Sequence, residues 1–315
     1  MPFSVRGYAA PLMRDVGSQE RIERHMDLAE FIAEQSPILL DGAMGTQLAA
    51  AGLEMGGENC VSHPDAVFSV HKRYSEIGCS LLTTNTLTMN RISIETHSVG
   101  VDVKEVNLSG ARLARSAATP GRYVLGDISS TGQLLEPYGG YSETQFYDTF
   151  REQAEHLLAG GADGFIVETM LDLREALCAL HACRDVSPLP VLVSLSFKTI
   201  ADGGRTVMGN TAKEIAVALA EAGAAAIGAN CGDLDPHETA VIIAIMKACV
   251  DLPLIAQPNA GRPHLVDGCT VFDMDPKAFA EGIAECIAAG AGLVGGCCGT
   301  TPDHIRCVAE LIGRQ

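Results

Sequence analysis

The chain alternates between short apolar runs and longer segments in which apolar residues recur with a helical period. Each run is rich in β-branched residues and is bounded by glycine or proline, which is typical of a buried strand followed by a helix. The runs are Ile38–Met44, Ser80–Thr86, Tyr123–Ser129, Gly164–Met170, Val191–Phe197, Ala226–Gly232, Leu254–Ala260 and Leu293–Gly299. This pattern predicts eight successive βα units.

Glycine-containing turns separate several predicted helices from the strand that follows. They are Ile77-Gly78-Cys79, Gly160-Gly161-Ala162, Ala222-Gly223-Ala224 and Ala289-Gly290-Ala291. Glycine tolerates the left-handed conformation that ends a helix, so these turns mark the return to the sheet. The pattern predicts an α/β fold, the (β/α)8 TIM barrel. A doubly wound open sheet is the alternative, but no Gly-x-Gly-x-x-Gly or Walker-type phosphate loop follows any predicted strand.

We expect a single barrel domain over residues 38–315, preceded by an N-terminal extension over residues 1–37. Residues 18–35 of the extension place Ile22, Met26 and Ile32 at helical spacing. We interpret this segment as an amphipathic helix that caps the bottom of the barrel. The connections after the first and third strands are long and glycine-rich, and they leave from the C-terminal face, which carries the chemistry in such barrels.

The composition narrows the range of functions. Of the 315 residues, 47% are hydrophobic and 19% are charged, which is sufficient for a large core. The formal net charge of −17 disfavours nucleic acid and anionic membranes as partners, because both need cationic surfaces. The longest apolar stretches, such as 240–246, are too short to span a membrane, and the N-terminus carries no signal-like run. We therefore expect a cytoplasmic protein.

Three cysteines fall at the ends of predicted strands, on the catalytic face. Cys231 ends the sixth strand, and Cys297 and Cys298 end the eighth, each within a glycine-rich stretch. Adjacent strand residues point to opposite faces, so neighbouring cysteines reach one point only where the backbone turns, and the flanking glycines permit that turn. Three converging thiolates match zinc, whose catalytic sites have three protein ligands and an open fourth position.

The open position indicates the chemistry. A centre of three thiolates is poorly suited to generating hydroxide, but it readily accepts a further thiolate. A free thiol is only a few per cent ionised at about pH 7, and metal coordination converts it to the thiolate. We therefore expect a metal-bound substrate sulfur to attack an electrophilic carbon.

Other interpretations of the cysteines were weighed against this one. The remaining cysteines are expected to be small buried side chains: Cys60, Cys79, Cys178, Cys183, Cys249, Cys269, Cys286 and Cys307. A redox dithiol is disfavoured because no Cys-x-x-Cys motif is present and vicinal disulfides are geometrically awkward. A closed structural zinc site would need His304 as its fourth ligand, but that residue falls inside the final predicted helix.

The motifs together resemble the homocysteine S-methyltransferase family. They are Asp41-Gly42-Ala43-Met44-Gly45-Thr46, Thr84-Asn85-Thr86, Gly126-Asp127-Ile128 with Thr131-Gly132, Ser194-Leu195-Ser196-Phe197, Asn230-Cys231-Gly232, Pro258-Asn259-Ala260-Gly261 and Gly295-Gly296-Cys297-Cys298-Gly299-Thr300-Thr301-Pro302. The resemblance runs from about residue 38 to the C-terminus. Within the family it is greatest to the homocysteine-binding barrel of cobalamin-dependent methionine synthases.

The resemblance implies roles for particular residues. Zinc would be held by the three cysteines, with the homocysteine sulfur as fourth ligand and methionine as product. The amino-acid end of the substrate would be bound by Asp41, by backbone amides around Gly45 and Thr46, and by Glu168. Asn230 directly precedes the metal ligand Cys231 and would orient that cysteine. Alternatively, Asp41 is a strand-end turn residue and Glu168 part of an internal ion pair.

The methyl donor is not fixed by the motifs. The resemblance does not extend to folate- or cobalamin-binding modules, so a methylated corrinoid (cobalamin) on a separate partner protein is our first expectation. S-methylmethionine or S-adenosylmethionine comes second. Betaine comes third, because a quaternary ammonium needs aromatic faces and only Tyr138 and Tyr141 lie near the predicted mouth. The segment 56–60 departs from the family pattern and leaves one side of the donor pocket and the role of Cys60 open.

Two functions from other classes were considered. Lys198 ends the fifth predicted strand and could serve as a Schiff-base nucleophile, but it precedes a polar loop and is better interpreted as a solvated surface lysine. A zinc- or corrinoid-handling protein would present the same thiolates without catalysing a reaction. Neither the acceptor, which could be a relative of homocysteine, nor the oligomeric state follows from the sequence.

Overall fold

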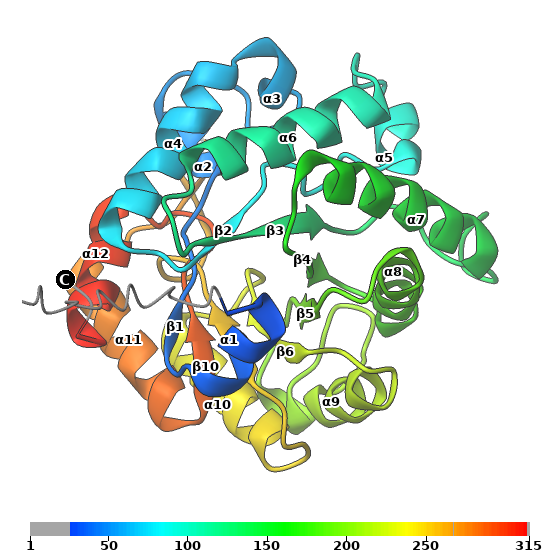
Figure 1. Ribbon diagram of the computed structural model, residues 1–315. Coiled ribbons are helices and arrows are strands. Elements are labelled where there is room, and N and C mark those ends of the chain that lie inside the picture. Colours follow the sequence, from blue (N-terminus) through cyan, green and yellow to red (C-terminus); the bar gives the residue numbers. More distant parts are fainter. Residues whose placement is uncertain (1–25, 267, 314–315) are drawn as a thin grey trace, which may run out of the picture.

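The computed structural model describes residues 26–266 and 268–313, and it confirms the barrel (Figure 1). The parallel strands are β1 (Ile38–Leu39), β2 (Leu81–Thr83), β3 (Tyr123–Ile128), β4 (Gly164–Met170), β5 (Val191–Leu195), β6 (Ala226–Asn230), β7 (Leu254–Gln257) and β10 (Ala291–Val294). They form one sheet in the order β1-β10-β7-β6-β5-β4-β3-β2, and a parallel bridge between Leu40 and Leu81 joins its two edges. Because chain order is kept around the barrel, the doubly wound alternative is wrong.

Helices surround the strands. The long ones are α4 (Pro64–Ile77), α6 (Val103–Ala117), α7 (Glu143–Gly160), α8 (Leu173–Val186), α9 (Ala212–Glu221), α10 (Pro236–Lys247), α11 (Pro276–Ala288) and α12 (Pro302–Leu311). Shorter elements are α1 (Leu28–Glu34), α2 (Gly45–Ala50), α3 (Asn59–Ser62), α5 (Arg91–Thr96) and the 3-10 turn η1 (Ala201–Gly203). Each predicted βα unit is therefore present, and the first two carry extra short helices on the C-terminal face of the barrel.

The local sequence explains where the helices begin and end. Capping boxes start α7 at Ser142, α9 at Thr211 and α10 at Asp235. The predicted glycine turns adopt positive φ, for example 107° at Gly78 and 113° at Gly290. These glycines end the helices and direct the chain back into the barrel.

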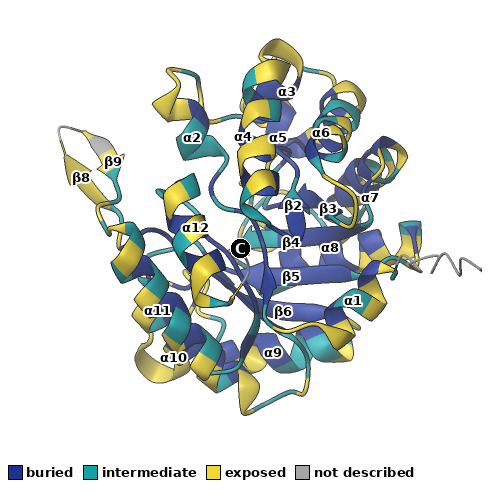
Figure 2. Ribbon diagram, turned by 60° about the vertical axis from the view of Figure 1, so that its left-hand side comes forward, coloured by how far each residue is buried: buried dark blue, intermediate teal, exposed yellow. Residues whose placement is uncertain are grey.

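The core has two layers, which Figure 2 shows as dark strands inside helices that are exposed only on their outer faces. One layer lies between strands and helices. The other fills the lower barrel with side chains such as Ile166, Leu192 and Ile255. Leu28 and Ile32 of α1 belong to this inner cluster, so α1 closes the N-terminal end of the barrel. The first part of the predicted helix, residues 18–25, lies outside the described residues.

The observed strands are shorter than the predicted runs. β6 ends at Asn230 and β7 at Gln257, and the residues that follow leave the sheet to line its mouth. The structure also adds a feature that was not predicted, a hairpin of β8 (His264–Val266) and β9 (Cys269–Val271) between β7 and α11. It projects from the C-terminal face (Figure 2). None of the described helices has the length and hydropathy needed to cross a lipid bilayer.

Candidate metal centre and active site

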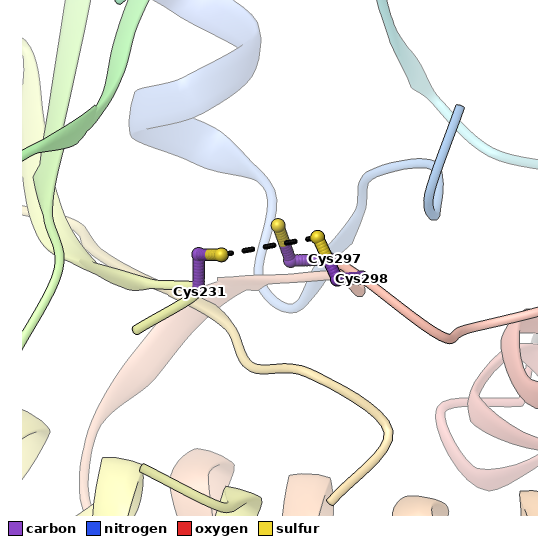
Figure 3. Close-up of side chains that lie close together, drawn as sticks. All are labelled: Cys231, Cys297 and Cys298. Carbon is purple, nitrogen blue, oxygen red and sulfur yellow. Dashed lines mark hydrogen bonds between the residues drawn. The ribbon is translucent and has the colours of Figure 1, made fainter. Parts of the chain in front are cut away.

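The three cysteines expected to bind zinc lie together at the mouth of the barrel. The sulfur atoms of Cys231 and Cys298 are 3.9 Å apart, and all three sulfur atoms lie within 4.8 Å of one another. Figure 3 shows the side chains converging from the end of β6 and from the segment after β10. All three residues are half-buried and line a cavity, so a small molecule in that cavity can approach them.

Backbone contacts with the end of β7 and the residue that follows it bring the two cysteine stretches together. The N–H of Cys231 donates to the Gln257 carbonyl at 3.2 Å, and the N–H of Cys297 donates to the Pro258 carbonyl at 2.9 Å. Cys231 has a φ of 52°, a conformation uncommon for non-glycine residues. A Cβ atom on Gly296 would lie 2.6 Å from Thr300, so this tight turn requires glycine. The cysteines converge because the strands end here.

The cluster fits a tetrahedral metal ion. With metal–sulfur bonds of about 2.3 Å, tetrahedral zinc places its sulfur ligands about 3.8 Å apart, close to the separation of Cys231 and Cys298. Hydrogen bonds with Cys231 and Cys297 lower the pKa of Cys298 to about 4, whereas hydrogen bonds with Cys231 and Cys298, together with burial, hold the pKa of Cys297 well above its usual value. The thiolate form of Cys298 is therefore favoured even without a metal ion. A bound cation would favour the thiolate form of all three cysteines.

The alternative roles of the cysteines and of His304 receive no support. Every cysteine whose side chain is described is a free thiol. The two ring nitrogens of His304 contact the Thr301 hydroxyl and the Met274 carbonyl, at 2.9 Å each, and the imidazole is not part of the cysteine cluster. Cys60 is buried, and its thiol donates to the Asn85 carbonyl at 3.2 Å. It therefore supports the cavity wall from behind and does not join the metal ligands.

A cavity of about 270 Å³ opens beside the sulfur atoms. Asp41 lines it, is 3% exposed, and accepts a hydrogen bond from the Thr83 N–H at 2.8 Å. Burial raises the pKa of Asp41 to about 7. Glu168 also lines the cavity, and burial, with smaller contributions from Asp41 and Cys231, raises its pKa to about 8. Among the described residues, no cationic side chain pairs with either carboxyl group to stabilise its charged form.

Gly45 and Thr46 line the same cavity. The sequence analysis placed them in the long connection after the first strand, whereas the structure places them in a helix. They are the first residues of α2, so their N–H groups have no partner within the helix. The Thr46 hydroxyl accepts the N–H of Gly299 at 3.2 Å, which ties α2 to the segment after the vicinal cysteines. The cavity thus has carboxyl groups and free N–H groups on its walls, and sulfur atoms at one end.

Asn230 connects the carboxyl groups to the metal centre. Its side-chain oxygen accepts hydrogen bonds from the Thr169 N–H at 2.9 Å and the Ser194 hydroxyl at 2.6 Å. Its amide nitrogen donates to the Thr169 hydroxyl at 2.8 Å and to Glu168 at 3.2 Å, and lies 4.0 Å from the Cys297 sulfur. These bonds hold Thr169 at a φ of 58° and direct Glu168 into the cavity.

Several lining residues were not anticipated, among them Met55, Gly57, Thr83, Asn85 and Gln257. Gly57 belongs to the segment 56–60, which departs from the family pattern, and Met55 directly precedes it, so this stretch forms one wall of the cavity. No signal in the sequence singles out Thr83 or Gln257, which fall inside the predicted runs 80–86 and 254–260 but end the observed strands β2 and β7.

Three residues with alternative roles in the sequence analysis do not line the cavity: Tyr138, Tyr141 and Lys198. Tyr138 is 79% exposed, and Tyr141 packs against Phe146, with ring centroids 5.8 Å apart. Lys198 pairs with Asp233 on the surface, so the Schiff-base interpretation is not supported.

Comparison with known proteins agrees with this geometry. A sequence model of the homocysteine S-methyltransferase family matches residues 38–312. Methionine synthase of Mycobacterium leprae is 34% identical and that of Mycobacterium tuberculosis is 32% identical, each over 91% of this chain. The chain spans only 25% of the length of either relative.

The fold also matches a solved structure, the homocysteine methyltransferase MmuM from Escherichia coli in its metallated form. The TM-score is 0.73 with 23% sequence identity, and the match covers 89% of this chain and 98% of that one. The expected resemblance is confirmed, and the chain belongs to the homocysteine S-methyltransferase family.

Proposed function

We propose that this protein transfers a methyl group to the sulfur of homocysteine, forming methionine, with zinc held by Cys231, Cys297 and Cys298. The observation that carries the proposal is the convergence of three accessible sulfur atoms at one end of a cavity whose walls suit an amino acid. Zinc in this site would supply a Lewis acid that keeps a substrate thiol in its thiolate form at neutral pH.

The other walls account for the amino-acid end of the substrate. The carboxyl groups of Asp41 and Glu168 pair with the substrate ammonium, whose arrival compensates for the desolvation that raises their pKa values. The free N–H groups of Gly45 and Thr46 receive the substrate carboxylate. Asn230 keeps Glu168 and Thr169 in place, so the substrate sulfur is directed to the cysteine end of the cavity.

Methyl transfer then needs little further chemistry from the protein. The substrate thiol loses its proton, its sulfur forms a bond to the methyl carbon, and the bond from that carbon to the donor breaks. The departing donor keeps the electron pair. The chain contributes orientation and charge placement, and the cavity walls exclude water from the reacting atoms.

We propose a methylated corrinoid on a partner protein as the donor, and two observations favour it. First, no aromatic residue lines the described cavity, so a cage for the quaternary ammonium of betaine is lacking there. Second, large apolar side chains are exposed on the loops that surround the mouth: Met55, Leu134, Tyr138, Leu171, Ile200, Val207, Met208, Leu265 and Val266. An apolar rim of this kind suits a macromolecular donor better than a small polar one.

We place the reaction in the cytoplasm, and we assign the barrel to residues 38–315 and a capping role to the extension before it. S-methylmethionine or S-adenosylmethionine is the alternative donor.

Parallel assays distinguish the donors. Zinc-loaded protein is incubated with homocysteine and, separately, methylcobalamin, S-methylmethionine, S-adenosylmethionine or betaine, and methionine is quantified. We expect the highest rate with methylcobalamin. Turnover only with a sulfonium donor would contradict the corrinoid proposal but retain homocysteine methylation. Loss of zinc to homocysteine without turnover of any donor would contradict both and favour a metal-handling protein.

A further inference from the structure

The upper layer of the barrel interior is polar, in contrast to the apolar layers beneath it. Ile255 belongs to the inner apolar cluster, and Gln257 lies two residues further along β7, on the same side of the strand. Asn230 is its partner in register on the neighbouring strand β6. β7 lies between β6 and β10, the two strands that lead into the cysteines. Gln257 therefore lies in the cavity wall beside the metal centre.

Gln257 and Asn230 differ in one respect. Every polar atom of the Asn230 side chain has a partner, as described above. Gln257 is 3% exposed, its side-chain oxygen is buried, and no hydrogen bond within the described residues engages that oxygen. A buried acceptor without a donor destabilises the protein, and such groups in native structures usually have a functional reason.

The cavity indicates which donor is missing. A substrate ammonium carries three N–H groups. Asp41 and Glu168 supply acceptors for two of them. Gln257 lines the same cavity, and because its amide oxygen is buried in the substrate-free protein, a turn of the side chain would present that oxygen as the third acceptor. We propose that the side-chain carbonyl of Gln257 accepts the third hydrogen of the substrate ammonium, so that this residue selects thiols that carry an amino group. This inference rests on the proposed homocysteine activity.

Substrate analogues provide the test. Wild type and Gln257→Met are assayed with homocysteine, with 3-aminopropanethiol, which lacks the carboxylate, and with 4-mercaptobutanoate, which lacks the amino group. We expect kcat/KM of the variant to fall at least about 10-fold for the two amino thiols and to change less than about 2-fold for 4-mercaptobutanoate. Gln257→Leu serves as a second variant if Gln257→Met folds poorly.

Thermal unfolding separates this role from a structural one. Removing an amide whose buried oxygen has no partner should leave the melting temperature of the substrate-free protein unchanged or higher, whereas loss of a structural contact would lower it. Thr206→Val is the matched control, because the Thr206 hydroxyl is also buried without a partner but lies outside the cavity. It should leave kcat/KM unchanged for all three thiols.

The outcomes are distinct. If wild type methylates homocysteine and Gln257→Met retains its kcat/KM, the inference is wrong and the proposed function stands. A loss confined to the two carboxylate-bearing thiols would assign Gln257 to the carboxylate and overturn the inference. If wild type fails to methylate homocysteine, the proposed function fails first, and the inference falls with it.

Discussion

Replacing Cys298 by alanine is expected to remove zinc and activity together. The Cys298 sulfur lies 3.9 Å from that of Cys231 and within 4.8 Å of that of Cys297, so its loss leaves two ligands for an ion that needs at least three from the protein. Zinc content should fall from about one ion per chain to near zero, since affinity depends on the full ligand set. Activity should fall by at least about 10²–10³-fold, the loss typical of removing a single electrostatic group.

A second cysteine provides the control for that variant. Cys307 lies on α12 and is not part of the sulfur cluster. Cys307→Ala should keep both zinc and activity. Zinc is measured by atomic emission on gel-filtered protein, and activity with homocysteine and the best donor. If Cys298→Ala keeps stoichiometric zinc, the ligand assignment is wrong.

Replacing Glu168 by glutamine is expected to weaken homocysteine binding while zinc is retained. The substitution keeps the shape of the side chain but removes the charge that pairs with the substrate ammonium. Truncating one partner of a buried charge pair costs about 2–5 kcal/mol, equivalent to about a 30- to 5000-fold loss in kcat/KM. The effect should appear chiefly in KM, because the ammonium is remote from the reacting sulfur.

Glu175 offers the matched control for this variant. Its carboxylate is 3% exposed and accepts bonds from the Thr131 N–H and hydroxyl, but it lies outside the cavity. Glu175→Gln should lower stability and leave KM for homocysteine nearly unchanged. A Glu168→Gln enzyme with wild-type KM would show that the ammonium binds elsewhere.

The fold could be predicted because its signals are local. A strand followed by a helix shows as a change of hydrophobic period, and Gly78, Gly161, Gly223 and Gly290 adopt the positive φ expected at the predicted helix ends. The extent of the strands was less predictable, because it depends on pairing with neighbours. β1 keeps only Ile38 and Leu39 in its ladder with β10, and Leu40 adds a single bridge to Leu81, although the apolar run is longer.

The convergence of the cysteines was also predictable, because it follows from topology. Parallel strands bring their carboxyl ends to one face, so Cys231 and the pair Cys297 and Cys298 had to lie at the same end of the barrel. Their separation was not predictable. It depends on the C-terminal end of β7, where the carbonyl groups of Gln257 and Pro258 accept hydrogen bonds from the N–H groups of Cys231 and Cys297.

The parts of the site that were not predicted depend on long-range register. Asn230 was expected only to orient a metal ligand, yet it bonds to Glu168, Thr169 and Ser194, which are distant in sequence. The sequence also holds the dipeptide Asp267-Gly268, which is typical of hairpin turns, between the segments that form β8 and β9. Gln257 could not be found from its sequence context, because only the folded cavity shows that its amide oxygen has no partner.

X-ray absorption at the zinc edge tests the central claim most directly. Zinc-loaded protein is measured before and after addition of homocysteine. We expect three sulfur ligands and one lighter ligand before addition, and four sulfur ligands at about 2.3 Å afterwards. A first shell with fewer than three sulfur atoms, or one that homocysteine leaves unchanged, would contradict the claim that three cysteines hold an ion open to a substrate thiol.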